Sequence, residues 1–483
     1  MPSPASPGPA EQDPASHGLV VVANRLPVQR TEADAEWETS PGGLVRALMG
    51  TLRQGGGAWV GWAGSVGDAP PPFEHDGVRL LPLSLDEAEY EGFYEGFSNE
   101  ALWPLYHDGI RPSTFDPAWW DTYVSVNQRF AEAASRVAAP GGLVWVHDYQ
   151  LQLVPAMLRE LRPDVRIGYF LHIPFPPAEL FSRLPWREQV LEGILGADVI
   201  GFQRQVAVEN FAASASRLLD VAADLPVMKL GPRKMHVGAF PISIDVEEFD
   251  ALARMPETVE QAWKLRNRMG SPKHVLLGVD RLDYTKGIVE RLKAFERLLE
   301  EGRISPRDTV MVQLAVPTRG RLEHYAEERR QVEQLVGSIN GQFGRIGYPI
   351  VHYLHQSLSL EDLVPLYQAA DVMVVTPLGD GMNLVAKEFA ASRIDGMGVL
   401  VLSEFAGAAD ELTDALLVNP HDQAALADAL MAALEMPTEE VRARMAAIRA
   451  TVEVSDVRRW AANFLALLSD ADHEPGWAGP SAA

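Results

Sequence analysis

The sequence predicts an α/β protein built from two halves, each with a largely parallel β-sheet. Short apolar runs rich in β-branched residues, such as Gly18 to Ala23, recur along the chain. Helical patterns with apolar residues four apart follow several of them, as from Ile288 to Leu299. This alternation is typical of parallel sheets covered by helices. It stops near Asp245 and starts again at Val275, which indicates two doubly wound, Rossmann-like units.

Length and composition narrow the function classes. A chain of 483 residues suits two domains. The formal net charge of -24 argues against a nucleic-acid partner, so an anionic substrate must be held by a local cluster of Arg and Lys. The chain has no cysteine, which excludes disulfides, thiolate metal sites and a cysteine nucleophile. No apolar run of about 18 residues predicts a membrane-spanning helix, so we expect no membrane partner.

The two ends of the chain differ from its interior. Residues 1–17 are rich in Pro, Ala and Ser and lack the basic start and apolar run of a signal peptide. We expect a disordered tail there and a loose tail over 471–483. A cytoplasmic location is expected, and the lack of cysteine is compatible with it without proving it. We expect one domain over 18–243 and a second over 244–455.

A C-terminal helix is expected over 456–470. Its apolar face carries Trp460, Phe464 and Leu468 at spacings of four. We expect this helix to pack back on the first domain.

Polar residues follow the expected strands of the first half. Arg25 follows the first strand, Asp148 follows Leu143–His147, and His172 follows Ile167–Leu171. For His172, a hydrogen-bonded structural role and a ligand role are equally favoured by the local sequence. For the aromatic residues Tyr94 and Trp103, packing is the simpler interpretation, although such rings also bind sugars.

Helix starts and loops in both halves supply possible anion contacts. Gly42 and Gly43 open a helix, where a phosphate can approach the backbone, but turn chemistry alone favours such a pair. Arg281 and Lys286 share the loop after Val275–Val279. A guanidinium fork and a mobile ammonium suit a diphosphate, and the alternative is a solvated basic loop. Arg319 follows the next strand.

The stretch Leu378 to Glu388 is the most informative. It joins the strand Asp371–Pro377 to a helix and places Asp380 between two glycines. The helix start offers free N–H groups to an anion, and Glu388, one turn after Leu384, could reach a ribose. In isolation an ordinary capping turn would be favoured.

The strand-exit pattern reverses that preference. Strand-exit residues of two facing parallel sheets converge on the cleft between them. The residues concerned are Arg25, Asp148, His172, Arg281, Arg319 and Asp380. Cations, two acids and a histidine in one cleft form the composition of a site for phosphorylated sugars.

Ordered motifs give a specific resemblance. The chain contains N-R-L-P, P-G-G-L, Y-E-G-F-S-N, L-W-P, H-D-Y, H-I-P-F-P, D-R-L-D-Y-T-K-G, D-G-M-N-L-V-A-K-E and S-E-F-A-G-A-A-D-E-L. In this order, from about Leu19 to about Leu468, the set resembles the trehalose-6-phosphate synthases, a retaining glycosyltransferase family of the GT-B architecture. The resemblance implies an inter-domain active-site cleft and transfer of glucose from a nucleotide-glucose to glucose 6-phosphate.

Residue roles follow from the resemblance by position. Acceptor-binding positions match Arg25, Tyr94, Trp103, Asp148 and Arg319. Donor-binding positions match Gly42, Gly43, Arg281, Lys286, Leu358, Asp380, Asn383, Leu384, Val385 and Glu388. The catalytic group implied is Arg281, Lys286, His172 and Asp380, with His172 near the anomeric carbon of the donor sugar.

The resemblance also implies how the reaction runs. Basic groups and a helix N-terminus would stabilise the leaving diphosphate, and its oxygen would take the acceptor proton. No protein nucleophile, cofactor or metal is expected, and no H-E-x-x-H or D-x-D metal motif is found. Family members often form dimers or tetramers, so a homo-oligomer is expected without any interface signature in the sequence.

Two points stay open at the level of sequence. Many family members have Arg where this chain has Gly379, which puts donor preference or closure of the site in doubt. UDP-glucose and GDP-glucose both remain possible donors. The rival interpretations are an enzyme that couples cyclitol phosphates, a catalytically silent sugar-phosphate sensor, and a sugar phosphorylase. The intact Gly-Gly and R-L-D-Y-T-K-G patterns argue against the first. The retained Arg281, Lys286 and Glu388 argue against the second, and no pyridoxal-phosphate lysine setting is found for the third.

Overall fold

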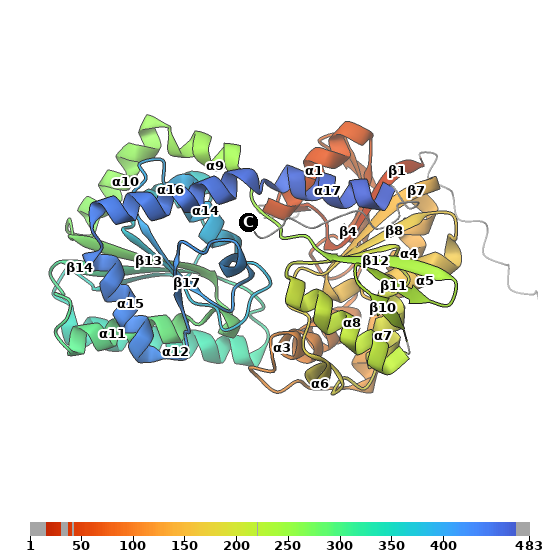
Figure 1. Cartoon of the computed structure of the whole chain (residues 1–483), viewed down its shortest axis with the longest axis horizontal. Helices are drawn as coiled ribbons and strands as arrows, with labels where there is room; N and C mark the ends of the chain where they lie inside the picture. Colours follow the sequence, from red (N-terminus) through yellow and green to blue (C-terminus); the bar gives the residue numbers. More distant parts are fainter. Residues whose placement is uncertain (1–15, 30–36, 41–42, 220, 470–483) are drawn as a thin grey trace, which may run out of the picture.

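Two lobes lie side by side, each built around one β-sheet (Figure 1). The computed structural model describes residues 16–29, 37–40, 43–219 and 221–469. We call the lobe that holds strands β1 to β12 the N-lobe and the lobe that holds β13 to β18 the C-lobe. The expected tails over 1–17 and 471–483 fall almost wholly outside the described residues.

The N-lobe sheet has ten strands in the order β10-β11-β12-β9-β8-β7-β1-β4-β6-β5. Its centre is parallel, and β5, β10 and β11 pair antiparallel at the edges. The strands are β1 His17–Arg25, β4 Ala58–Trp62, β5 Phe73–His75, β6 Val78–Leu83, β7 Ala138–His147, β8 Arg166–Phe170, β9 Val199–Phe202, β10 Ala222–Asp224, β11 Val227–Leu230 and β12 Arg233–Ala239, beside a separate pair β2 Val28–Gln29 and β3 Glu38–Thr39.

Helices cover both faces of this sheet. α4 packs on β1, β4 and β7, whereas α1 packs on β1 and β6. The helical segments are α1 Gly43–Gly55, α2 Glu87–Glu89, the π-helix η1 Tyr90–Leu102, α3 Trp103–Tyr106, α4 Pro117–Val137, η2 Tyr149–Leu151, α5 Val154–Leu161, α6 Ala178–Phe181, α7 Arg187–Ile194 and α8 Gln205–Leu219. Sequence periodicity did not predict η1, since a π-helix does not follow the 3.6-residue repeat.

The C-lobe sheet is parallel throughout, in the order β15-β14-β13-β16-β17-β18. Its strands are β13 His274–Arg281, β14 Thr309–Val316, β15 Val351–Leu354, β16 Val372–Val375, β17 Val399–Ser403 and β18 Leu416–Val418. The helical segments are α9 Val246–Ala253, α10 Pro256–Arg268, η3 Tyr284–Lys286, α11 Ile288–Glu300, α12 Glu323–Phe343, α13 Leu360–Ala369, α14 Leu384–Ser392, η4 Gly407–Asp410, α15 Gln423–Glu435 and α16 Thr438–Val454. Apolar residues of α11, α12 and α15 fill one face, and α9, α13, α14 and α16 cover the other.

The charged segment that follows the first sheet, from Val246 to Met269, belongs to the C-lobe. It forms two helices, α9 and α10, and both pack on α13. Pro256 begins α10, because proline suits the first turn of a helix but would break a continuous one.

The last helix, α17 Val457–Ser469, runs from the C-lobe across to the N-lobe (Figure 1). It contacts α1, β8 and β9. The ring of Phe464 stacks on Trp145 with centroids 4.4 Å apart, and Trp460 lies 5.0 Å from the same ring. Apolar burial of these aromatic rings therefore ties the end of the chain to the N-lobe sheet.

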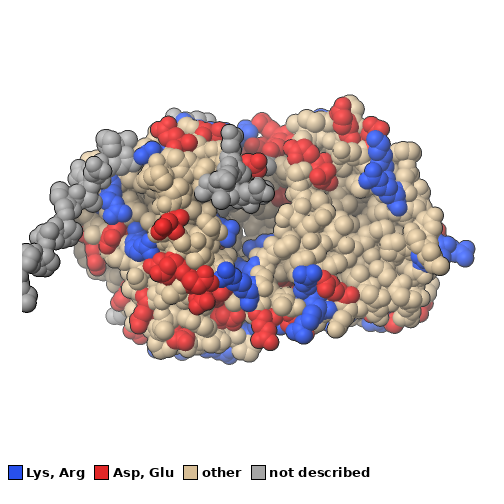
Figure 2. Space-filling model, turned by 180° about the vertical axis from the view of Figure 1, so that it is seen from behind, with Lys and Arg blue, Asp and Glu red and all other residues tan. Residues whose placement is uncertain are grey.

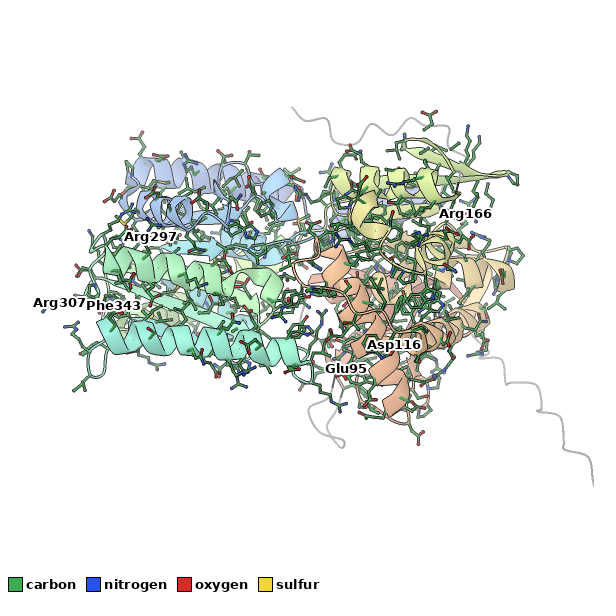
Figure 3. All side chains as sticks on the ribbon, turned by 90° about the horizontal axis from the view of Figure 1, so that it is seen from below. Glu95, Asp116, Arg166, Arg297, Arg307 and Phe343 are labelled. Carbon is green, nitrogen blue, oxygen red and sulfur yellow. The ribbon has the colours of Figure 1, made fainter. Side chains whose placement is uncertain are left out.

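The strands of both lobes end toward the junction. Arg166, the first residue of β8, lies on the outer side of the N-lobe, and Arg307, just before β14, lies at the outer end of the C-lobe (Figure 3). The strands of each parallel core start on the outside and run inward. The two sets of strand exits consequently face each other, the arrangement in which open α/β sheets place ligands.

Candidate active site at the lobe junction

Lys286 and Asp380 meet at the C-lobe side of the junction. The Lys286 ammonium donates to the Asp380 carboxylate, with Nζ 2.5 Å from Oδ2, and both side chains are largely buried. Burial alone would raise the pKa of Asp380, but the charge and hydrogen bond of Lys286 outweigh it and hold the pKa below its ordinary value. A cation and an ionised acid are thus fixed at one point.

The first turn of α14 starts beside this pair. Asn383 is the N-cap, with a left-handed φ of 78°, and its side chain accepts a hydrogen bond from the Ala386 amide. Its Nδ2 lies 3.2 Å from Asp380 Oδ2. The helix begins at Leu384, so free N–H groups and the positive end of the helix dipole lie next to Lys286. This geometry suits an anionic ligand.

Trp103 of the N-lobe lies against two arginines of the C-lobe. The Arg319 guanidinium carbon is 3.9 Å from the centroid of its ring, and that of Arg281 is 5.4 Å away. Arg319 also donates to the Tyr149 hydroxyl at 2.8 Å. The cation–π contact and this hydrogen bond hold the Arg319 side chain against the N-lobe. The guanidinium groups of Arg281 and Arg319 therefore lie between the lobes.

Asp148 and His172 form the N-lobe floor of the site. Asp148 has an unusual backbone φ of 74° at the exit of β7, and its carboxylate accepts from the His172 amide at 3.2 Å. Burial raises the pKa of Asp148 to about 6. The His172 ring has partners on both nitrogens, with Nε2 3.1 Å from His147 Nδ1 and Nδ1 3.4 Å from Gln203 Nε2. Burial lowers the pKa of His172 to about 3, so the ring is neutral.

Arg25 and Tyr94 lie around Trp62. The Arg25 guanidinium carbon is 4.9 Å from the Trp62 ring centroid, and the Tyr94 ring is 5.9 Å from it. Arg25 is exposed and Tyr94 is half-buried. Tyr94 belongs to η1, the helix that brings Glu95 near the junction (Figure 3). Arg25 is therefore a fourth cation of the site, and its side chain is open to an incoming group.

A cavity of about 400 Å³ opens beside Arg281 in the C-lobe. Most of its wall is apolar, including Leu358 and Val385, and Glu388 stands at it. Glu388 accepts a hydrogen bond from the Tyr367 hydroxyl at 2.8 Å. Asp245, Glu248 and Asp280 also line it. An apolar slot edged by carboxylates has the character of a nucleoside site, in which an acid accepts hydrogen bonds from ribose hydroxyls.

The surface view agrees with this arrangement. Figure 2 shows a hollow between the two lobes, with lysine and arginine atoms along its margin. Of the glycine pair, Gly43 is the first residue of α1, and Gly42 lies outside the described residues. Within the described part of the chain, no group of three or more His, Asp or Glu side chains is arranged to hold a metal ion. None of the helices described there has the length and apolar character that a bilayer crossing needs.

Four further residues join the site that sequence reasoning did not single out. Tyr149 holds Arg319, and Asp283 lies under it with a carboxylate oxygen 3.5 Å from the guanidinium. His107 places its ring 4.1 Å from Trp103. Gly381 lies so close to the N-lobe that an added Cβ would be 2.1 Å from the His172 carbonyl oxygen. Asp283 lies in the motif D-R-L-D-Y-T-K-G and Tyr149 in H-D-Y. Their closeness in sequence to Arg281 and Asp148 could therefore have marked both as candidate site residues.

Two facing parallel-sheet lobes, with cations and acids at their junction and a cavity beside Arg281 in the C-lobe, form the arrangement of a glycosyltransferase of the GT-B fold. The sequence matches glycosyltransferase family 20 over residues 17–470. A protein of Mycolicibacterium gilvum named trehalose-6-phosphate synthase is 54% identical over 475 residues, which cover 95% of this chain and 94% of that protein. This chain belongs to glycosyltransferase family 20.

Solved structures give the same family. An Escherichia coli structure described as bound with UDP-2-fluoro glucose superposes with a TM-score of 0.87 at 34% identity, covering 93% of this chain and 98% of that one. A Burkholderia xenovorans α,α-trehalose-phosphate synthase (UDP-forming) in complex with glucose-6-phosphate has a TM-score of 0.86 at 34% identity, covering 93% and 99%. The chain is therefore an enzyme of the glycosyltransferase class.

Proposed function

We propose that this enzyme is a cytoplasmic trehalose-6-phosphate synthase that transfers glucose from a nucleotide-glucose to glucose 6-phosphate with retention of configuration and without a metal. The observation that carries the proposal is the presence of two groups of cations at one junction. Lys286 lies beside Asp380 and the start of α14, and Arg319 of the C-lobe lies against Trp103 of the N-lobe. The same two ligand classes occupy the relatives described above.

On the donor side, Arg281, Lys286 and the N–H groups of Leu384 and Val385 would hold the diphosphate. The cavity beside Arg281 would take the nucleoside, with Leu358 against the base and Glu388 on the ribose. Asp380 would contact the transferred glucose, and the segment that begins at Asn383 would cover the phosphates and the ribose. As the glycosidic bond breaks, negative charge grows on the diphosphate, and fixed positive groups stabilise it there.

On the acceptor side, Arg25, Arg319 and Tyr94 would hold the phosphate of glucose 6-phosphate, and Trp103 would help to hold Arg319 in place. Asp148 would accept hydrogen bonds from the sugar hydroxyls. The leaving phosphate oxygen would take the acceptor proton on the same face of the donor sugar. His172 would lie near the anomeric carbon of the donor sugar as a neutral ring, because its low pKa removes a role as a general acid.

The test is an assay of the purified enzyme with glucose 6-phosphate and either UDP-glucose or GDP-glucose, in EDTA and in Mg²⁺. We expect nucleotide diphosphate release that requires glucose 6-phosphate, continues in EDTA, and yields an α,α-linked non-reducing disaccharide phosphate by NMR. The donor with the higher kcat/KM identifies the base preference that the sequence left open. Release that needs no glucose 6-phosphate, or a β-linked product, would contradict the proposal, and a cyclitol phosphate as the sole acceptor would identify the rival coupling enzyme.

A further inference from the structure

Asp283 is a buried acid that belongs to neither substrate-contacting set. Its side chain is wholly buried below the loop that joins β13 to α11. Burial would raise the pKa of this carboxyl, but Arg319, Arg281 and Lys286 together hold it at about 2. The group is thus a permanent negative charge between cations. Buried charges of this kind persist only where several donors satisfy them.

One oxygen of Asp283 fixes the donor-side loop. Oδ1 accepts from the Thr285 amide at 3.0 Å and from the Thr285 hydroxyl at 2.9 Å, which closes the turn η3 that ends at Lys286. The Thr285 carbonyl in turn accepts from the Leu378 amide at 2.7 Å. Through Thr285, Asp283 therefore fixes the positions of Lys286 and of the start of the loop that contains Asp380.

The other oxygen fixes the acceptor-side arginine. Oδ2 accepts from the Tyr325 hydroxyl at 3.2 Å and lies 3.5 Å from Arg319 Nη1. Arg319 has a strained backbone φ of 45° and also donates to the Tyr325 hydroxyl. Its Nε is buried and has no partner among the residues that the structure describes. The guanidinium is thus held in place by Tyr149, Tyr325 and Asp283.

We propose that Asp283 is a positioning residue that fixes the two phosphate-binding cations, Arg319 and Lys286, relative to each other. The inference rests on the proposed function, because it needs one substrate phosphate on each cation. Each carboxylate oxygen acts through its own set of contacts, which we call an arm. The arm of Oδ1 runs through Thr285 to Lys286, and the arm of Oδ2 runs through Tyr325 to Arg319. A structural acid that merely stabilised the fold would not distinguish the two substrates.

Three variants separate the arms. Tyr325→Phe removes only the hydroxyl that links Asp283 to Arg319, so we expect the KM for glucose 6-phosphate to rise roughly tenfold with the KM for the nucleotide-glucose within about twofold. Thr285→Val removes only the hydroxyl of the other arm, so the KM for the nucleotide-glucose should rise by a similar factor instead. Asp283→Asn puts a donor where an acceptor is required and should raise both KM values.

A double-variant comparison sharpens the test. The fold-changes in KM caused by Thr285→Val and by Tyr325→Phe should multiply in the double variant, because the two substitutions act through separate contacts of Asp283. In contrast, Thr285→Val should change the KM values little further when it is added to Asp283→Asn. Thermal unfolding of every variant shows that each is folded. If Tyr325→Phe moves both KM values equally, or if Asp283→Asn leaves both unchanged, the inference is wrong. If Asp283→Asn does not fold, the split between the two single-arm variants decides. A wild-type enzyme that shows no transfer to glucose 6-phosphate would instead overturn the proposed function.

Discussion

The two sides of the proposed site are built differently. The donor-side side chains that contact one another, such as Lys286 and Asp380, belong to the C-lobe, and the described donor-side residue of the N-lobe is Gly43, at the start of α1. The acceptor-side residues come from both lobes: Arg25, Tyr94, Trp103 and Asp148 belong to the N-lobe, and Arg319 of the C-lobe contacts Trp103 and Tyr149. Most of the donor site can thus form in one lobe, whereas the acceptor site is complete only when the lobes are docked.

The difference separates two ways to lose activity. Substitution of a C-lobe cation should remove stabilisation of the leaving group. A substitution that disturbs the docking of the lobes should leave those cations in place but leave the acceptor site incomplete. The predictions below change one side at a time, so that each either supports or contradicts this division.

The largest effect is expected from Arg281→Ala. It removes a cation that faces the junction, and kcat/KM should fall about 10²–10³-fold, the usual loss for one group that stabilises developing charge. Arg307→Ala is the matched control, because Arg307 is exposed at the outer end of the C-lobe (Figure 3). Steady-state kinetics of both variants give the comparison. Near-normal turnover of Arg281→Ala would place the diphosphate elsewhere.

Gly381→Ala tests the docking of the lobes without touching a charge. The new Cβ would lie 2.1 Å from the His172 carbonyl oxygen, so the lobes have to separate slightly. We expect kcat/KM to fall about 10- to 100-fold, since a small misplacement of reacting groups is costly. Gly379→Ala is the control, because its nearest neighbours would be 3.9 and 4.0 Å away. Equal losses in the two variants would argue against steric separation as the cause.

The acceptor side should show a pH dependence set by Asp148. Burial raises its pKa from an ordinary 3.8 to about 6. Below pH 6 the carboxyl takes up a proton and accepts fewer hydrogen bonds, so kcat/KM for glucose 6-phosphate should fall up to about tenfold per pH unit. In Asp148→Asn this limb should be absent. An unchanged acid limb in the variant would assign it to another group.

The raised pKa of Asp148 also predicts how the free energy of unfolding depends on pH. The folded state binds the Asp148 proton more tightly than the unfolded state does, so its contribution is full below pH 3.8 and is lost as the pH rises through 6. Relative to the wild type, Asp148→Asn should therefore gain up to about 3 kcal/mol between pH 4 and pH 7. Urea unfolding at several pH values measures this difference.

The smallest effect is expected from Asp410→Ala. Arg204 of the N-lobe donates two hydrogen bonds of 2.7 Å to Asp410 of the C-lobe, but the Asp410 side chain is 51% exposed. The free energy of unfolding should change by less than about 1 kcal/mol, because water and salt screen such pairs. A loss comparable to that of a buried pair would show that this contact contributes more to holding the lobes together than the aromatic contacts of α17 do.

Much of the site could be predicted from residues that are neighbours in sequence. Arg281 and Lys286 share one loop, and Asp380 and Asn383 share another, so the order of strands alone placed each group at a strand exit. The ring of His172 shows the limit. Its neighbour His147, 25 residues earlier, engages one nitrogen, and no local pattern indicated that contact. The register of β7 against β8 brings the two strand ends together.

The sequence by itself determined the two parallel-sheet units, the strand exits with their charged residues, and the family, because periodicity and motif order are properties of short stretches. Only the tertiary structure decided which groups face each other across the junction: Arg319 on Tyr149, Arg281 over Trp103, and the Gly381 backbone against the His172 carbonyl. These contacts join residues up to 209 positions apart. They depend on how two separately covered sheets dock, and side-chain packing between lobes leaves no repeating pattern in the chain.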